Sequence, residues 1–379
     1  MFSPEHQAVE RTTMYRNVLI LALSITVVNV FVARAADTSQ VTFNDEGIAI
    51  VNGKPFFPIG VFTYGLSPEV LAELREVKCN TVVNGFQPDQ LDLIHQQGLM
   101  AICPPNDAWI AAAKDHSALL AWYLTDEPEN RGVTPAGELA RYQALKKQDP
   151  RHPIGLCHTS FEALSQFKDA CDFTMTDIYP ITAARDRNIM GVSIMMDEAR
   201  RIHGKGWPQW TCIQTFGGPE ADGGIWAVPL PHEVRFMTYL ALVHRATGIL
   251  YFSYWPQAPR TWQSIALLND EIHRLVPWLV APGREGIATS VDERVEVRVR
   301  HIRQEGAKMF EPRNGFIIAI NTSPVFVRTT IRSDAGVLEL RMPFEGGERI
   351  TAANGEFPVD FTPYGVHVYL WGNSPTQPR

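Results

Sequence analysis

The chain has 379 residues, of which 45% are hydrophobic and 20% are charged, a composition typical of a soluble globular protein with a sizeable core. Its formal net charge of -7 at pH 7 argues against nucleic acid or an anionic membrane surface as a partner. The length predicts one large domain and a smaller one.

Residues 1–36 have the pattern of a secretory signal peptide. Two arginines precede an apolar run over residues 18–32, and Ala33-Arg34-Ala35 has the small-x-small form of a cleavage site. The apolar run is short for a transmembrane helix and contains an asparagine. We therefore expect a secreted or periplasmic protein whose mature chain begins near Ala36, with no membrane anchor after cleavage.

The cysteines are odd in number, and most lie within or beside apolar runs that resemble strands. They are Cys79, Cys103, Cys157, Cys171 and Cys212. We interpret them as small buried hydrophobic residues rather than as disulfides or metal ligands. No pair of them has zinc-site spacing with histidine, so we expect no metal.

Residues 37–282 predict a (β/α)8 barrel, also called a TIM barrel, preceded by a short ribbon. Asn52-Gly53 between two alternating runs is a hairpin signal for the ribbon. The predicted strands cover residues 58–63, 81–86, 100–104, 121–125, 154–158, 173–178, 209–215 and 249–254. Helical patterns between them include residues 68–77, 90–97, 135–148, 161–168, 194–203 and 232–246. A doubly wound sheet is the alternative, but no glycine-rich phosphate loop follows the first strand.

Residues 283–379 alternate between apolar and polar positions and show no helical pattern, which predicts a small antiparallel β-sandwich. Its strands are expected at residues 295–299, 315–320, 325–331, 337–341 and 366–370. Turns are expected at Asn314-Gly315, Gly346-Gly347 and Asn354-Gly355. The segment shows no aromatic row suited to a polysaccharide, so we expect a structural role.

The stretch Ala121-Trp-Tyr-Leu-Thr-Asp-Glu-Pro-Glu129 holds the main catalytic candidate. Pro128 cannot extend a central strand, so Asp126 and Glu127 should lie at its carboxyl end, where the active sites of these barrels are found. Apolar and aromatic neighbours favour the protonated form of Glu127, as a general acid requires. The alternative is that the acid pair only caps the next helix.

The ends of the other predicted strands carry side chains suited to binding a sugar. Aromatic rings can stack on the apolar faces of pyranose rings, while amides and acids form hydrogen bonds with hydroxyl groups. No histidine–carboxylate cluster indicates a catalytic metal, and we expect no cofactor. The candidate substrate-binding residues are Tyr64, Asn84, Trp122, Asp126, Tyr179, Gln214, Phe216, Tyr254 and Trp255.

Four motifs resemble those of clan A glycoside hydrolases, in the same chain order. Asn52-Gly-Lys-Pro-Phe-Phe-Pro-Ile-Gly60 resembles the segment leading into their first strand, and Asp177-Ile-Tyr-Pro180 the end of their sixth. Trp122-Tyr-Leu-Thr-Asp-Glu-Pro128 resembles their fourth strand, where a glutamate is the acid/base, and residues 231–255 resemble the seventh helix and eighth strand. The resemblance covers about residues 43–278 and implies a glycosidase with Glu127 as proton donor.

Two positions depart from the clan pattern. Asp126 stands where the clan usually has asparagine, and Gln214 stands where the clan has its nucleophilic glutamate, although an amide can neither attack an anomeric carbon nor act as a base. Three substitutes are open: Asp177 as base for a water with inversion, Glu220 as nucleophile, or Asp126 orienting a substrate acetamido group. We predict Glu127 as acid with Asp177 as base or electrostatic partner, and Gln214 as a hydroxyl ligand.

The sequence therefore predicts an exported glycoside hydrolase with a carbohydrate substrate. Two alternatives remain open. One is a barrel that binds carbohydrate without catalysis, which the missing strand-seven glutamate suggests. The other is a substrate-assisted, hexosaminidase-type glycosidase that uses Asp126 and Glu127.

Overall fold

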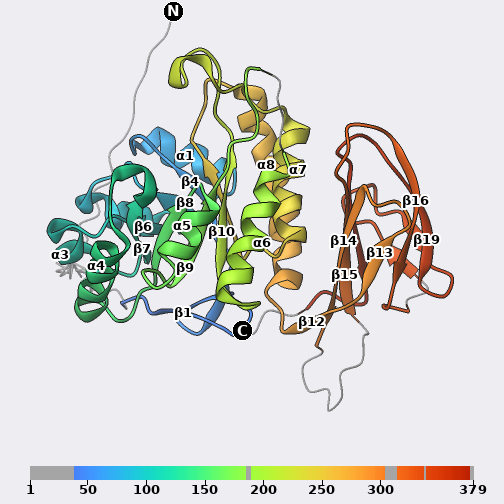
Figure 1. The fold of residues 1–379 in the computed structure, drawn as a ribbon, viewed down its shortest axis with the longest axis horizontal. Coiled ribbons are helices and arrows are strands. Elements are labelled where there is room, and N and C mark those ends of the chain that lie inside the picture. Colours follow the sequence, from blue (N-terminus) through green and yellow to red (C-terminus); the bar gives the residue numbers. More distant parts are fainter. Residues whose placement is uncertain (1–37, 185–188, 304–313, 337–338, 376–379) are drawn as a thin grey trace, which may run out of the picture. The chain divides into compact units, whose positions relative to one another are not determined.

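The structure is a computed structural model that describes residues 38–184, 189–303, 314–336 and 339–375 (Figure 1). The predicted signal peptide lies outside these residues. No helix within the described ranges is long and apolar enough to cross a membrane.

In the described part of the chain, eight parallel strands close a barrel, which confirms the (β/α)8 prediction. Consecutive strands pair in order, and the last strand pairs with the first through Ile249 and Ile59. The strands are β4 (Ile59–Phe62), β5 (Thr81–Val83), β6 (Met100–Cys103), β7 (Leu119–Asp126), β8 (Ile154–His158), β9 (Phe173–Asp177), β10 (Gln209–Gln214) and β11 (Gly248–Phe252).

Helices connect the barrel strands. Side-chain caps begin several of them: Ser67 accepts a hydrogen bond at the start of α1, and Thr134 does so at the start of α4. The helices are α1 (Pro68–Glu76), α2 (Leu91–Gln96), α3 (Asp107–Ala113), α4 (Pro135–Gln148), α5 (Phe161–Gln166), α6 (Gly191–His203), α7 (Pro231–Val243) and α8 (Pro259–Leu279). Short 3-10 turns form η1 (Pro88–Gln90), η2 (Pro128–Arg131) and η3 (Asp222–Gly224). The helices predicted from the sequence do not include α3 or α8.

A three-stranded ribbon precedes the barrel and covers the amino ends of its strands. It consists of β1 (Val41–Phe43), β2 (Ala49–Val51) and β3 (Lys54–Phe56). Asn52 and Gly53 both have positive φ, at 49° and 79°, and connect β2 to β3, which confirms the predicted hairpin. The ring of Phe43 contacts the rings of Phe173 and Trp210 near the starts of β9 and β10. The barrel interior is therefore closed at this end.

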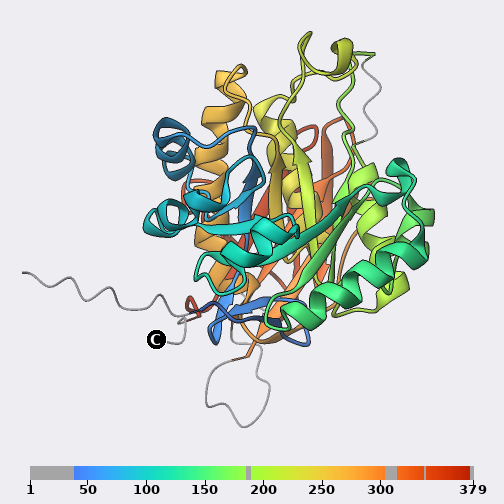
Figure 2. The same cartoon turned by 90° about the vertical axis from the view of Figure 1, so that its left-hand side faces the viewer.

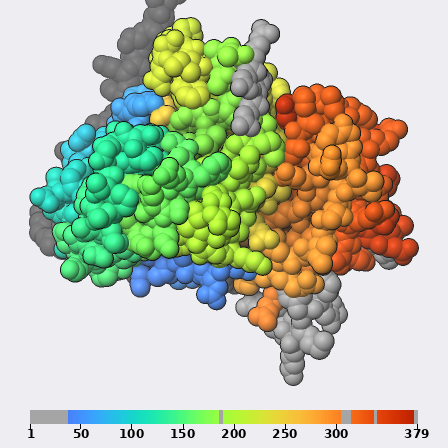
Figure 3. Space-filling model, viewed as in Figure 1, coloured from blue at the N-terminus to red at the C-terminus, as the bar shows by residue number. Residues whose placement is uncertain are grey.

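The loops that follow the strands lie at the opposite, carboxyl end. The loop after β10, which carries η3, projects beyond the strands (Figure 2) and forms a separate protrusion in the space-filling view (Figure 3). Because the ribbon closes the amino end, the described residues leave the barrel interior open toward the carboxyl end.

The described C-terminal strands form two antiparallel sheets, which confirms the predicted sandwich. The six-stranded sheet has the order β12-β14-β15-β20-β17-β18, and the three-stranded sheet has the order β13-β16-β19. The strands are β12 (Gly283–Glu285), β13 (Ala288–Ser290), β14 (Val295–Ile302), β15 (Asn314–Asn321), β16 (Val327–Ser333), β17 (Glu339–Arg341), β18 (Arg349–Thr351), β19 (Glu356–Phe361) and β20 (Val366–Trp371).

The turn expected at Asn314-Gly315 is wrong, because these residues begin β15 and pair with Ile302 and His301 on β14. A Cβ atom on Gly315 would lie 2.2 Å from the ring of Trp371, so close packing requires the glycine rather than a turn. Gly346-Gly347 and Asn354-Gly355 do have positive φ, as expected for turn residues. The predicted strand at residues 337–341 falls partly outside the described residues.

One face of the six-stranded sheet packs on helix α7 of the barrel. Phe316 and Ile318 of β15 belong to the same buried apolar cluster as Phe236 and Leu240 of α7. The opposite face, which includes Ile317, packs against the three-stranded sheet. The sandwich therefore shares its core with the barrel.

Candidate active site

A cavity of about 940 Å³ opens at the carboxyl ends of the barrel strands. Its walls come from the residues that end or follow β4, β7, β8, β9, β10 and β11, the position at which barrels of this kind hold their active sites. Residues predicted from the sequence to bind or transform substrate make up part of this wall: Tyr64, Asp126, Glu127, Asp177, Tyr179, Phe216 and Trp255.

Two consecutive acids, Asp126 at the end of β7 and Glu127 directly after it, line the cavity because the chain turns sharply at Glu127 before η2. Successive side chains of a strand point to opposite faces, so Asp126 and Glu127 would be separated if the strand continued. Glu127 instead has left-handed backbone angles, with φ 47° and ψ 62°, and Pro128 begins η2. For a residue with a Cβ this conformation costs about 1–2 kcal/mol and is characteristic of functional sites.

The Asp126 carboxylate is fixed by two donors. The Tyr123 hydroxyl donates to Oδ1, and Arg131 Nη2 donates to Oδ2 at 2.6 Å. Arg131 Nε also donates to the Asp126 carbonyl oxygen at 2.6 Å, so the guanidinium holds both the backbone and the side chain. The hydrogen bond and the negative charge of Asp126 raise the pKa of Arg131. Asp126 is therefore oriented by a permanent positive charge.

Glu127 is half-buried and has one open oxygen. Asn130 Nδ2 donates to its Oε2 at 3.0 Å and also to Thr159 Oγ1 at 3.2 Å. No described residue forms a hydrogen bond with Glu127 Oε1. This oxygen is free to contact a substrate in the cavity.

Asp177 is the buried carboxyl group of the site, with 7% of its surface exposed. Burial raises the pKa of Asp177 to about 8; the charges of Glu127 and Asp126 act in the same direction, while the Tyr179 hydroxyl and Cys157 thiol oppose the shift. Asp177 Oδ1 is buried and has no hydrogen-bond partner among the described residues. Asp177 therefore holds a proton at neutral pH and has an oxygen available for a ligand.

Aromatic rings form another part of the wall. The Tyr179 ring stacks on Phe252, with centroids 5.3 Å apart, and meets Phe216 edge to face at 4.9 Å. Trp255 lies 6.2 Å from Phe216, and Tyr64 is 68% exposed at the cavity mouth. Exposed aromatic faces beside carboxylates suit a ligand with both apolar faces and hydroxyl groups.

The structure contradicts the predicted substrate contact of Trp122. Its side chain is fully buried outside the barrel interior, in the same cluster as the barrel helices, and its Nε1 donates to Asp149 Oδ2 at 2.8 Å. Tyr123, the next residue of β7, faces the barrel interior instead. The alternation of side chains along a strand explains the error.

Gln214 has a structural role rather than the predicted role of hydroxyl ligand. It is fully buried; its Oε1 accepts a hydrogen bond from Ile181 N at 2.9 Å, while its Nε2 donates to Ile181 O at 3.0 Å and to Ala227 O at 3.2 Å. A glutamate here could accept but, when ionised, not donate. The amide joins the loops that follow β9 and β10, which accounts for glutamine at this position.

Asn84 and Tyr254 also lie outside the cavity wall. The backbone carbonyl of Asn84 accepts a hydrogen bond from Thr63 Oγ1 at 2.7 Å, and Asn84 has a positive φ of 52°. The Tyr254 hydroxyl donates to Glu73 Oε2 of α1 at 2.7 Å, and its ring meets Trp262 of α8. Both residues stabilise the connections around the barrel.

Several residues of the wall were not expected from the sequence. Asn130 and Arg131 of η2, Thr159 after β8 and Trp226 in the loop after β10 all line the cavity. The only sequence signal for Arg131 is a basic residue shortly after an acid pair, which is common in exposed loops. Where these loops fold back over the barrel depends on tertiary contacts, not on local patterns.

The ligand atoms of Asp126, Cys157 and Asp177 lie within 4.8 Å of one another, a separation at which three groups could hold a metal ion. The chemistry of the three groups fits a cation poorly. Arg131 already pairs with Asp126, and burial raises the pKa of the Cys157 thiol well above its usual value. The arrangement is better suited to two carboxyl groups that differ in protonation.

All five cysteines are buried and free, as expected.

No protein-family model matches the chain, and no curated protein sequence matches it. Solved structures do match, and several of them are titled as glycoside hydrolases or glycosidases. One titled only as a glycoside hydrolase has a TM-score of 0.59 at 11% identity, and the match covers 89% of this chain and 98% of that one. The chain thus has the fold of glycoside hydrolases of the barrel type, as the motifs implied.

Two further matches are more specifically titled. A putative α-galactosidase/melibiase from Bacteroides fragilis has a TM-score of 0.56 at 12% identity, covering 86% of this chain and 80% of that one. A GH27 β-L-arabinopyranosidase from Geobacillus stearothermophilus, in complex with arabinose, has a TM-score of 0.54 at 11% identity, covering 84% and 97%. At these identities the likeness concerns the fold, and it extends beyond the barrel.

Proposed function

We propose that the protein is a glycoside hydrolase in which Asp177 donates a proton to the leaving group and Asp126 acts as the nucleophile. The observation that carries this proposal is a pair of neighbouring carboxyl groups in contrasting environments: Asp177 is buried, whereas the Asp126 side chain is 44% exposed and paired with Arg131. Environments that separate the protonation of two such groups define an acid and its partner.

The distance between the two groups supports a retaining reaction. One carboxyl oxygen of each residue lies within 4.8 Å of the other, which is compatible with the roughly 5–5.5 Å between the two acids of retaining glycosidases and shorter than the roughly 6.5–9.5 Å of inverting ones. Asp177 would protonate the glycosidic oxygen while a carboxylate oxygen of Asp126 bonds to the anomeric carbon. Asp177, then ionised, would take a proton from the water that hydrolyses this ester. Because Asp177 holds a proton at neutral pH, it suits a donor better than the base expected from the sequence.

Glu127 is the alternative proton donor, as the clan A resemblance implies. Its open Oε1 also suits a ligand for a sugar hydroxyl, and its charge helps to keep Asp177 protonated. The two roles differ in their dependence on the leaving group. A proton donor is essential only for poor leaving groups, whereas a hydroxyl ligand affects all substrates alike.

The substrate class is supported by the fold and by the cavity wall. The matched structures include proteins titled as glycosidases for galactose-type and arabinose-type sugars, and aromatic rings beside carboxylates suit a glycoside. We therefore propose a carbohydrate substrate.

The proposal is tested with a panel of aryl glycosides and oligosaccharides. Asp177→Asn should lose about 10²–10⁴-fold on natural linkages yet keep much of its activity on activated aryl glycosides. Asp126→Asn should lose both activities. Asp222→Asn is the matched control, because this acid lines the cavity but bonds Trp226. Proton NMR of the first-formed sugar should show retention; inversion, or normal turnover by Asp126→Asn, would show the assignment of Asp126 to be wrong.

A barrel that binds carbohydrate without hydrolysing it is the second candidate. The observation that favours it is the structural use of Gln214, at the position where clan A enzymes have their nucleophile. Calorimetry with the same oligosaccharides, together with no turnover on the whole panel, would establish binding without catalysis.

We also propose that the protein is exported, on the basis of the signal-like residues 1–36. N-terminal sequencing of protein recovered outside the cytoplasm should begin near Ala36. An intact N-terminus on that protein would contradict cleavage.

A further inference from the structure

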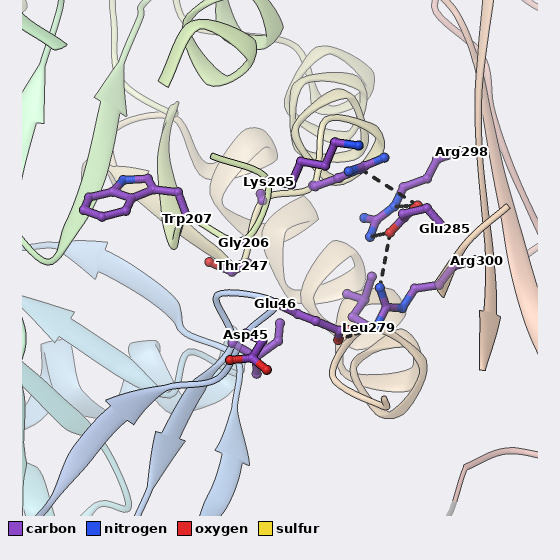
Figure 4. A pocket seen from close by; sticks show the side chains of 13 residues that line it. Asp45, Glu46, Lys205, Gly206, Trp207, Thr247, Leu279, Glu285, Arg298 and Arg300 are labelled. Carbon is purple, nitrogen blue, oxygen red and sulfur yellow. Dashed lines mark hydrogen bonds and ion pairs between the residues drawn. The ribbon is translucent and has the colours of Figure 1, made fainter. Parts of the chain in front are cut away.

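A second cavity, of about 230 Å³, lies on the amino side of the barrel, where the ribbon, the end of α7 and strand β14 meet (Figure 4). None of the residues of the candidate active site lines it. Four basic side chains do: Lys205, Arg245, Arg298 and Arg300. They face three acidic ones, so the lining has an excess of positive charge.

Two of the guanidinium groups have structural partners. Arg298 donates to Glu285 at 2.8 and 3.2 Å and to the Leu242 carbonyl of α7 at 2.6 Å. Arg300 donates to Glu285 at 3.2 Å and to Glu46 of the ribbon at 2.5 Å. Burial raises the pKa of Glu285, but the surrounding arginines outweigh it and lower the pKa to about 2. Glu285 and Glu46 are thus fully engaged in holding these arginines.

The other two cations lack comparable partners. Lys205 forms no ion pair or hydrogen bond with any described residue, and Arg245 has only a 3.9 Å contact to Glu285. The remaining acid, Asp45, lies away from the guanidinium groups in Figure 4, whereas Lys205 extends toward Glu285 and Arg298. Unneutralised positive charge is therefore concentrated at one end of the cavity.

Arg300, which also lines this cavity, has a buried donor that is unpaired. Arg300 is 5% exposed, and its Nε has no hydrogen-bond partner among the described residues. A buried donor of a charged group is costly to leave unpaired, and such an atom in a native fold indicates a missing ligand or water.

The backbone conformation of Arg245 is a further indication of a ligand. Its N–H donates to Leu242 O and the N–H of Ala246 to Ala241 O, the pattern of a Schellman motif at the end of α7. This position has φ 67° and favours glycine. Arginine is therefore less favourable than glycine at this position, and its guanidinium has only the 3.9 Å contact to Glu285. A ligand for the guanidinium would account for its presence.

We propose that this cavity binds a tetrahedral oxyanion, a phosphate or a sulfate group, between Arg245 and Lys205. The planar fork of a guanidinium matches two oxygens of such an anion, and a lysine ammonium adds a third donor. The volume holds the anion with a small substituent, so the group is either free or part of a small ester. This site is independent of the proposed glycosidase activity.

Anion binding also has a structural consequence. Arg245 ends α7 of the barrel, while Arg298 and Arg300 belong to β14 of the sandwich, and the bound anion reduces the repulsion among them. Because the folded protein binds the anion and the unfolded chain does not, the anion raises the melting temperature.

The test is calorimetric titration of the purified protein at constant ionic strength with inorganic phosphate, inorganic sulfate and acetate. Phosphate and sulfate should bind saturably with one site per chain and raise the melting temperature, while acetate binds at least several-fold more weakly. Glucose 6-phosphate distinguishes the two sources. Tighter binding than inorganic phosphate identifies an ester as the ligand, and weaker binding identifies the free anion.

Arg245→Gly is the sharpest variant, because glycine suits the backbone and only the guanidinium is lost. It should fold with undiminished stability in the absence of anion and bind phosphate about tenfold or more weakly. Lys205→Met should weaken phosphate similarly. Arg328→Met, an exposed sandwich arginine paired with Asp360, is the control and should bind as the parent protein does. No saturable binding of phosphate or sulfate, or unchanged affinity in Arg245→Gly, would overturn the proposal.

Discussion

A carboxyl oxygen of Asp126 lies within 4.8 Å of a carboxyl oxygen of Asp177, although the two residues end different strands of the barrel. Two like charges this close, one of them removed from water, do not both form readily. The proton stays on the buried Asp177, and Arg131 keeps its charge beside Asp126. The fold thus creates a difference in protonation between two residues of the same type.

The first prediction concerns the pH dependence of hydrolysis. A proton donor works only while protonated, so kcat/KM of the parent protein should fall as pH rises through about 8, the pKa to which Asp177 is raised. Above that pH the fall should approach about tenfold per unit on substrates with poor leaving groups. In Asp177→Asn, the residual kcat/KM on activated aryl glycosides should not fall in this pH range. The same fall of kcat/KM in that variant would assign the proton donor to another group.

The first prediction extends to stability, because the same pKa shift of Asp177 destabilises the folded protein at high pH. The pKa of Asp177 is higher in the folded state than its ordinary value of 3.8, so the folded state loses stability as pH rises toward and through about 8. Asp177→Asn removes this loss and should unfold at a higher temperature than the parent protein at pH 9, with a smaller difference at pH 5. Lower stability of the variant at pH 9 would contradict the burial argument.

The architecture of this chain was predictable because its local patterns agree with one another. Alternating strand and helix segments, the Asn52-Gly53 hairpin and the change of pattern near residue 282 each indicate one element type. The site was only partly predictable. Strand ends identify which residues reach the carboxyl face, and this rule correctly brought Glu127 and Asp177 into one cavity.

The rule fails where side-chain direction or tertiary contacts decide the outcome. Trp122 precedes the inward-facing Tyr123 by one residue and so points to the helices. Gln214 is at a strand end, but its side-chain amide forms hydrogen bonds with the Ile181 backbone and not with the cavity. The left-handed turn at Glu127, which follows β7 and precedes η2, is also not specified by a local pattern.

The second prediction separates Trp122 from the substrate. Trp122→Phe removes the donor to Asp149 Oδ2, a buried oxygen that also pairs with His152, and should cost about 1–3 kcal/mol of stability. KM for the substrate should be unchanged. Trp255→Phe, which alters the cavity wall, should do the reverse: raise KM with little effect on the denaturation midpoint. A raised KM in folded Trp122→Phe would restore its predicted role.

The third prediction concerns the contact between sandwich and barrel. Phe316 of β15 is fully buried in the cluster shared with α7, so Phe316→Ala should lower the free energy of unfolding by about 3–5 kcal/mol. Sugar affinity of the folded variant should not change, because the residue lies outside the active-site cavity. The control is Phe326→Ala: this side chain is 55% exposed on the same sandwich, and its loss should cost less than about 0.5 kcal/mol.

The last prediction is a pH-dependent contribution of His244 at the same contact. Its Nδ1 lies 2.9 Å from Asp197 of α6 and its Nε2 lies 2.8 Å from Glu296 of β14, so one imidazolium joins barrel and sandwich. Burial alone would lower the pKa of His244, but the hydrogen bonds to these two carboxylates outweigh it and raise the pKa to about 9.

The folded pKa of His244 exceeds its ordinary value of 6.5, so the stabilisation is fully present below pH 6.5 and is lost as pH rises through about 9. Since one pKa unit corresponds to about 1.4 kcal/mol, the contribution is at most about 3.5 kcal/mol. In urea denaturation, His244→Gln should be less stable than the parent protein at pH 6, and the difference should shrink by pH 10. His95→Gln, at an exposed position on α2, should show no pH-dependent difference. A gap between parent and His244→Gln that is equal at pH 6 and pH 10 would show that His244 contributes by packing, not by its charge.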